Sequence, residues 1–113
     1  MKDNLVLINK YKKLIGQYII YSIIFPKKYY SLKDRLENLL FDILRDMYII
    51  NSLSDKQIRY VRKEELVGNI KYLNYLFVSI NKLSILSDKQ YKVLYISIEE
   101  IYKYLIGWLK SDK

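Results

Sequence analysis

Apolar side chains recur every three or four residues in four separate stretches of the chain, and charged side chains lie between them. In the clearest stretch the apolar positions are Tyr91, Leu94, Ile98, Ile101, Leu105 and Trp108. This spacing places them along one face of an α-helix, called its seam below. Ser87 and Gln90 have the spacing of a capping box, so we expect this helix to begin near Ser87.

Two more helices are expected in the first half of the chain. The seam of the first is Ile8, Tyr11, Ile15, Tyr18, Ser22 and Phe25, widened by Leu7, Leu14 and Tyr21. The seam of the second is Leu32, Leu36, Leu39, Ile43, Met47 and Ile50, widened by Leu40 and Leu44. Pro26 separates the two helices because proline cannot continue the hydrogen-bond ladder. Ser31 is the expected cap of the second helix.

The remaining helical pattern runs from about Asp55 to Leu83. Its seam is Leu66, Ile70, Leu73, Phe77 and Ile80, and we expect Ile58 and Val61 to continue it upstream. Ser54 or Asp55 is the expected cap. The charged stretch from Arg59 to Glu65 is interpreted as either a frayed helix end or a loop.

Four amphipathic helices with short links can bury their seams only against one another, and short links make sequential neighbours antiparallel. The chain has only three glycines and one proline, too few to punctuate a many-stranded sheet. The pattern therefore predicts an all-α fold. We expect residues 1–113 to form one up-down-up-down antiparallel four-helix bundle.

Composition argues against several classes of function. The chain has no cysteine and no histidine, which removes the commonest metal ligands and the commonest general base. The adjacent pairs Glu64–Glu65 and Glu99–Glu100 point about 100° apart on a helix, so neither pair can clasp one metal ion. No phosphate-binding glycine loop or nucleophile motif occurs. We therefore expect no catalytic residue, no metal and no cofactor.

Hydropathy and the N-terminal sequence give no sign of a membrane protein. The longest uncharged stretch, Leu14 to Pro26, is shorter than the ~20 apolar residues that a bilayer crossing needs. The first residues lack the charged-then-apolar order of a secretory signal. The expected location is the cytoplasm, with no membrane partner.

The chain is basic, with 20 lysines and arginines against 12 acidic residues and a net charge of +8. A charge of this size favours polyanions, although codon bias toward lysine, isoleucine and tyrosine would give a similar composition. The excess lies in residues 1–30 and 54–86, so two diagonal helices would carry two basic flanks. The candidate nucleic-acid contacts are Lys10, Lys12, Lys13, Lys27, Lys28, Arg59, Arg62 and Lys63. Tyr29 and Tyr30 are candidates for base stacking.

Several segments resemble a known family. They are Phe25-Pro26-Lys27, the stretch from Ser31 to Leu44 that contains Arg35-Leu36-Glu37-Asn38, the connection from Leu83 to Gln90, and Ile106-Gly107-Trp108-Leu109-Lys110-Ser111. With these segments in this order, the chain resembles the accessory variability determinant of diversity-generating retroelements over nearly its whole length.

The resemblance implies a homopentameric barrel of four-helix bundles. Such a protein binds the element's reverse transcriptase together with template RNA or cDNA during mutagenic retrohoming. Arg35 and Lys103 match basic positions of the family. Asn74 and Val78 stand where relatives commonly carry arginine. Our hypothesis is that the basic segment from Arg59 to Lys63 compensates for these two missing positive charges.

Two alternatives remain open from the sequence. The first is the related four-helix family encoded in intervening sequences of bacterial large-subunit ribosomal RNA genes. Its members typically carry a Pro-x-Asn-Ile-Ala-Glu-Gly-like stretch in the second helix, where this chain has Leu39 to Leu44. The second alternative is a structural interaction protein with no nucleic-acid role.

Overall fold

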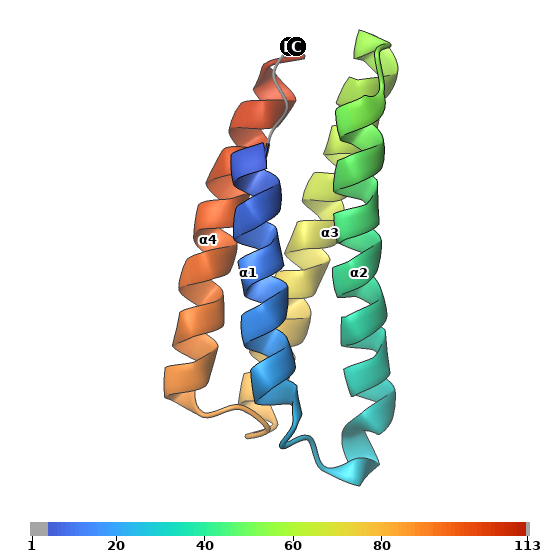
Figure 1. Cartoon of the computed structure of the whole chain (residues 1–113). Coiled ribbons are helices and arrows are strands. Elements are labelled where there is room, and N and C mark those ends of the chain that lie inside the picture. The colour runs from blue at the N-terminus through green and yellow to red at the C-terminus, as the bar shows by residue number, and fades with distance from the viewer. Residues whose placement is uncertain (1–4, 113) are drawn as a thin grey trace.

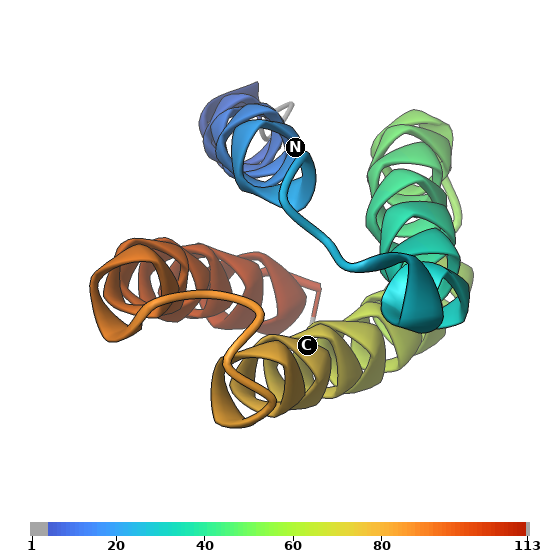
Figure 2. The same ribbon diagram turned by 90° about the horizontal axis from the view of Figure 1, so that it is seen from below.

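The computed structural model describes residues 5–112 and forms one bundle of four helices (Figure 1). The helices are α1 (Leu5–Ser22), α2 (Tyr30–Ser52), α3 (Lys56–Lys82) and α4 (Asp88–Lys110), and the 3-10 turn η1 (Lys27–Tyr29) precedes α2. Each helix packs against its sequence neighbours, and α1 also packs against α4. Consequently α1 and α3 are diagonal across the bundle (Figure 2). The predicted four-helix bundle is confirmed.

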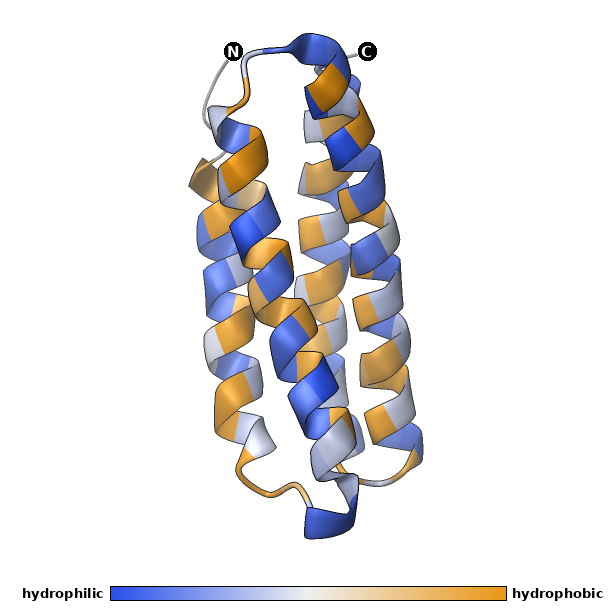
Figure 3. Cartoon of the chain, turned by 90° about the vertical axis from the view of Figure 1, so that its right-hand side faces the viewer, coloured by the Kyte–Doolittle hydropathy of each residue, from blue (hydrophilic) through white to orange (hydrophobic). Residues whose placement is uncertain are grey.

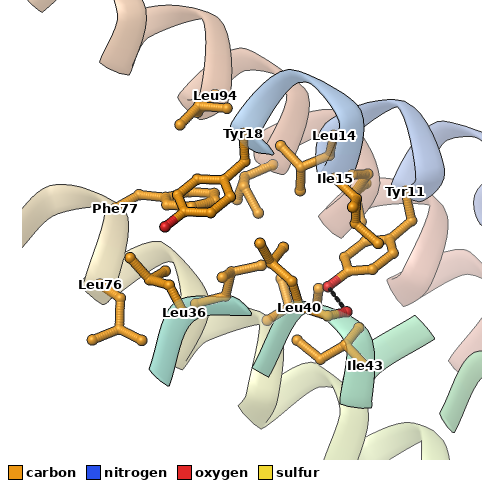
Figure 4. Close-up of a cluster of buried hydrophobic side chains, with 14 of the residues drawn as sticks. Tyr11, Leu14, Ile15, Tyr18, Leu36, Leu40, Ile43, Leu76, Phe77 and Leu94 are labelled. Carbon is orange, nitrogen blue, oxygen red and sulfur yellow. Dashed lines mark hydrogen bonds between the residues drawn. The ribbon is translucent and has the colours of Figure 1, made fainter. Parts of the chain in front are cut away.

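The core consists of the seams that the sequence pattern predicted, with small changes of register. Leu40 is fully buried whereas Leu39 is only partly buried, so the α2 seam is turned slightly from its expected position. Two buried tyrosines of α1 link the helices (Figure 4). The Tyr11 hydroxyl donates to the Leu40 carbonyl oxygen at 2.7 Å, and the Tyr18 ring stacks on Phe77 with a centroid distance of 5.9 Å.

Three helix starts test the expected caps. Ser87 and Gln90 form the complete capping box, so the predicted start of α4 is confirmed. The Asp55 carboxylate accepts a hydrogen bond from the Ile58 amide at 3.0 Å, so Asp55 rather than Ser54 caps α3. The prediction for Ser31 is wrong. The 3-10 turn leads directly into α2 at Tyr30, so Ser31 already lies inside the helix, which has no side-chain cap.

The charged stretch from Arg59 to Glu65 is neither frayed nor a loop, because it is helical throughout and lies within α3. The expected upstream seam was also wrong. Ile58 and Val61 are 49% and 51% exposed, whereas Arg59 and Lys63 are buried. Steps of three and four residues back from Leu66 reach Lys63 and then Arg59, so these cations occupy the seam positions.

Apolar residues also lie on the outside of the bundle, interspersed with polar ones (Figure 3). The most exposed is Ile23, at 80%, in the α1–α2 connection, followed by Ile20 and Tyr75 at 64% each. Within residues 5–112, none of the helices combines the length and the hydropathy that a membrane span requires.

Candidate nucleic-acid interface

The α1–α2 connection and the α3–α4 connection lie at the same end of the bundle (Figure 1), which we call the connection end. Four exposed lysines belong to this end: Lys27 and Lys28 on η1, Lys82 at the last position of α3, and Lys89 in the first turn of α4. Within residues 5–112, no carboxylate lies within ion-pairing distance of any of the four. Their charges are therefore available to an external partner.

Buried apolar residues fix the two connections that carry these lysines. Phe25 anchors the first connection, and Ile85 and Leu86 anchor the second. The second connection turns through Ser84, which has a φ of 60°, and the Ile85 amide donates to the Ile80 carbonyl oxygen at 2.9 Å. The lysines are thus held by packed backbone rather than by free loops.

Asp88, the acidic residue directly after the α3–α4 connection, accepts a hydrogen bond. The Asn81 side-chain amide donates to the Asp88 carboxylate at 2.9 Å, and Asp88 lies in the first turn of α4, where the helix dipole also favours a negative charge. Asp88 keeps its negative charge in this contact, and Asp34 is exposed near the start of α2, so the four lysines leave a net positive charge at the connection end.

Of the two predicted stacking residues, Tyr30 is the more exposed. It is 47% exposed. Tyr29 packs partly against the core, and Lys28 Nζ lies 5.2 Å from the centroid of its ring. The connection end thus combines cations with one exposed aromatic ring, a pairing that suits single-stranded nucleic acid.

The three predicted cations of α1 point to different neighbours instead of forming one face. Lys10 Nζ lies 3.2 Å from Glu100 and 5.2 Å from the Tyr104 ring centroid, both on α4. Lys12 Nζ lies 5.4 Å from the ring centroid of Tyr48 on α2. Lys13 is exposed and has no carboxylate partner among residues 5–112. Lys12 and Lys13 can therefore add to a polyanion surface, whereas the charge of Lys10 is largely balanced.

The predicted basic segment of α3 is not a surface patch. Arg59 is 8% exposed and Lys63 is fully buried, and Arg62 pairs with Glu65 at 3.6 Å. Nucleic acid cannot reach Lys63 or Arg59 in this arrangement. The structure therefore removes these two residues from the candidate interface and leaves Arg62 a weak contributor.

Arg59 and Lys63 instead form a buried cluster with the end of α4, which we call the Asp112 cluster (Arg59, Lys63, Trp108 and Asp112). Lys63 Nζ donates to the Asp112 carboxylate at 2.6 Å and to the Trp108 carbonyl oxygen at 2.9 Å, and it lies 4.3 Å from the Trp108 ring centroid. Arg59 Nη2 lies 2.9 Å from Asp112 Oδ1. Burial lowers the pKa of Lys63, although the hydrogen bond and the charge of Asp112 act in the opposite direction.

The positions that the family resemblance suggested have different surroundings. Arg35 is exposed and borders a hollow of about 450 Å³ between α2 and α3, which Asp34 and Asp42 also line. Lys103 is exposed on α4 without a carboxylate partner among residues 5–112. Lys103 can therefore attract phosphate, whereas the acids beside Arg35 weaken such an attraction.

Sequence reasoning did not assign Lys82 and Lys89 to the candidate site. Both lie more than fifty residues from Lys27 and Lys28 along the chain. The signal that could have found them is topological: in an up-down-up-down bundle the first and third connections share one end. Residues 5–112 hold no group of three or more side chains with the ligand chemistry and spacing for a metal ion.

Comparison with known proteins adds no assignment, because no protein-family model, curated protein or solved structure matches this chain.

Proposed function

We propose that this chain is a non-catalytic nucleic-acid-binding bundle whose connection end contacts the phosphates of RNA or DNA. The observation that carries the proposal is that Lys27, Lys28, Lys82 and Lys89, from two connections at one end of the bundle, are exposed and have no carboxylate pairing them within residues 5–112. Such an arrangement of cations attracts a polyanion by releasing its condensed counterions. Tyr30 supplies a stacking surface beside these cations.

The more specific role rests on the family resemblance. As an accessory subunit of a diversity-generating retroelement, the chain would hold template RNA or cDNA and dock the reverse transcriptase, to which the chemistry belongs. Assembly as a homopentamer would repeat the connection end around a ring. Repetition raises the effective affinity of a weak cationic site for a long polyanion without any new contact.

A matched pair of triple variants tests the interface. One variant replaces Lys27, Lys82 and Lys89 with Gln. The control variant replaces Lys56, Lys71 and Lys110 with Gln. These three lysines are also exposed and have no ion pair within residues 5–112. Both variants lose the same net charge, so only the position of the lost charge differs.

Affinity for a short single-stranded RNA or DNA is measured by fluorescence anisotropy over a range of salt concentrations. For the connection-end variant we expect affinity to fall on the order of tenfold at physiological salt. The slope of log K against log salt should also decrease by about 0.7 for each lost phosphate contact. The control should keep the wild-type slope. Equal losses in the two variants would show that only total charge matters, and binding insensitive to salt would contradict phosphate contacts altogether.

Docking of the reverse transcriptase is tested separately. The wild-type chain should co-purify with the reverse transcriptase of its own element and should scatter light as an oligomer. A monomer that binds neither the enzyme nor nucleic acid would instead favour a structural interaction protein. A gene located within a ribosomal RNA operon would favour the intervening-sequence family.

A further inference from the structure

The Asp112 cluster holds more positive charge and more donors than its single carboxylate can satisfy. Arg59 and Lys63 are both buried, and Asp112 is the only acid that pairs with them within residues 5–112. Arg59 Nη2 is close to Asp112, yet it makes no well-aligned hydrogen bond. Trp108 Nε1 is also buried without an acceptor among residues 5–112. Within residues 5–112, the cluster is therefore short of negative charge and of acceptor atoms.

A route from solvent to this cluster passes beside Asp112 itself. A hollow of about 540 Å³ is lined by Gln57, Tyr60, Val61 and Asp112. Asp112 belongs to the turn that follows α4, and its amide donates to the Leu109 carbonyl oxygen at 3.2 Å. Terminal turns of helices open at a low free-energy cost compared with the core. Displacement of Asp112 would thus remove the only carboxylate that pairs with the two cations among residues 5–112, while the four helices stay packed.

We propose that Arg59 and Lys63 form a binding site for a phosphate group, and that Asp112 occupies this site as an internal substitute that phosphate displaces. A phosphate group carries about 1.5 to 2 negative charges at neutral pH and presents three acceptor oxygens, so it balances two cations better than one carboxylate does. The planar guanidinium of Arg59 can hold two of these oxygens, and the Lys63 ammonium can hold another.

This site goes beyond the proposed function because it lies at the end of the bundle opposite the connection end. The connection end offers exposed lysines to a long polyanion, whereas the Asp112 cluster offers two buried cations to one phosphate group. Substitutions in one region leave the other region intact. Failure of either proposal can therefore be recognised independently of the other.

The experiment compares Asp112→Asn with Glu64→Gln in the full chain. Both variants lose one negative charge, and Glu64 is the exposed neighbour of Lys63 on α3, with no partner within residues 5–112. The melting temperature is measured by circular dichroism in sodium phosphate and in sodium chloride at equal ionic strength. We expect Asp112→Asn to be destabilised in chloride and to regain several degrees in phosphate. Wild type and Glu64→Gln should shift much less.

A double variant, Asp112→Asn with Lys63→Met, should lose the phosphate-dependent shift because it lacks one of the two receptor cations. The proposal is overturned if phosphate raises the melting temperature of Asp112→Asn and Glu64→Gln equally. It is also overturned if Asp112→Asn fails to fold in both salts, since phosphate would then not replace the carboxylate. In either case Asp112 serves only to hold the turn after α4 against α3.

Two further probes distinguish the possible sources of the phosphate group. They are a dinucleotide with a 5′-phosphate and the same dinucleotide with a 5′-hydroxyl, each added to Asp112→Asn in chloride. Greater stabilisation by the phosphorylated dinucleotide than by inorganic phosphate would assign the site to a nucleic-acid end. Stabilisation by inorganic phosphate that the dinucleotide does not exceed would assign it to the free anion.

Discussion

The two ends of the bundle contain the same kinds of cation in opposite environments. At the connection end, Lys82 and Lys89 are exposed, and neither has a carboxylate within ion-pairing distance among residues 5–112. At the other end, Lys63 and Arg59 lie in the core, where Asp112 pairs with both. The cause is their position on the helix: Lys63 and Arg59 continue the seam of α3, whereas Lys82 and Lys89 lie off the seams.

This comparison shows that a basic residue in a bundle sequence cannot be assigned to the surface by its charge alone. The same ammonium group attracts external phosphate when it lies off the seam and links two helices when it lies on it. The charge available to a partner is therefore smaller on α3, and larger at the connection end, than the distribution along the sequence indicates.

The largest effect is expected when a cation is removed from the buried end. Lys63→Met leaves Asp112 buried with only a poorly aligned arginine, and breaking a buried ion pair from one side typically costs about 3–5 kcal/mol. Lys82→Met removes the same charge from the same helix at an exposed position. Its free energy of unfolding should stay within about 0.5 kcal/mol of wild type. Urea denaturation followed by circular dichroism measures both values.

Equal stability of the two variants would mean that the Asp112 cluster contributes nothing to folding, and the distinction between the two ends would then fail. The distinction would also fail if Lys63→Met weakened nucleic-acid binding and Lys82→Met did not. Lys82→Met is expected to weaken binding to a strand that ends in a 5′-hydroxyl, whereas folded Lys63→Met should bind this strand like wild type.

The fold could be predicted almost completely from the sequence because seam spacing determines both the helices and the faces that they bury. The Asp112 cluster could have been predicted by the same rule. Stepping back from Leu66 reaches Lys63, and stepping forward from Trp108 by four residues reaches Asp112. Since α3 and α4 are antiparallel, these two positions fall at the same level. Lys63 was instead assigned to the surface because it is charged, so its pairing with Asp112 was not predicted.

Other features could not be derived from periodicity. The 3-10 turn before α2 depends on how the Phe25–Pro26 segment packs, so the absence of a cap at Ser31 could not be foreseen. The pairing of Lys10 with Glu100 depends on the relative rotation of α1 and α4. Within the candidate site, Lys27 and Lys28 were found from local charge, whereas Lys82 and Lys89 required the topology.

A pH titration sharpens the contrast between buried and exposed lysines. Burial lowers the pKa of Lys63 below its ordinary value of 10.5, despite the attraction of Asp112, and the nearby Arg59 lowers it further. Between the lowered value and 10.5 the unfolded chain binds more protons than the native chain. The stability of wild type relative to Lys63→Met should therefore rise with pH in this window, by at most about 1.4 kcal/mol per pH unit.

Urea denaturation of the two proteins at a series of pH values up to 10.5 gives this difference. Burial raises the pKa of Tyr11 and Tyr18, so these residues reduce stability above pH 10, their ordinary value. Both proteins contain them, and their effect cancels in the difference. A difference that falls with rising pH would show that attraction to Asp112 outweighs burial at Lys63.

The smallest effect concerns the helix starts at the two ends. Asp55→Ala removes the cap of α3, where the carboxylate accepts from the Ile58 amide, and should destabilise the protein by about 1 kcal/mol. Ser31→Ala, near the start of α2 at the connection end, should change stability by less than about 0.5 kcal/mol because Ser31 caps nothing. If thermal denaturation showed that both variants lose the same stability, Ser31 would be a helix cap after all. In that case the 3-10 turn that positions Lys27 and Lys28 would be open to doubt.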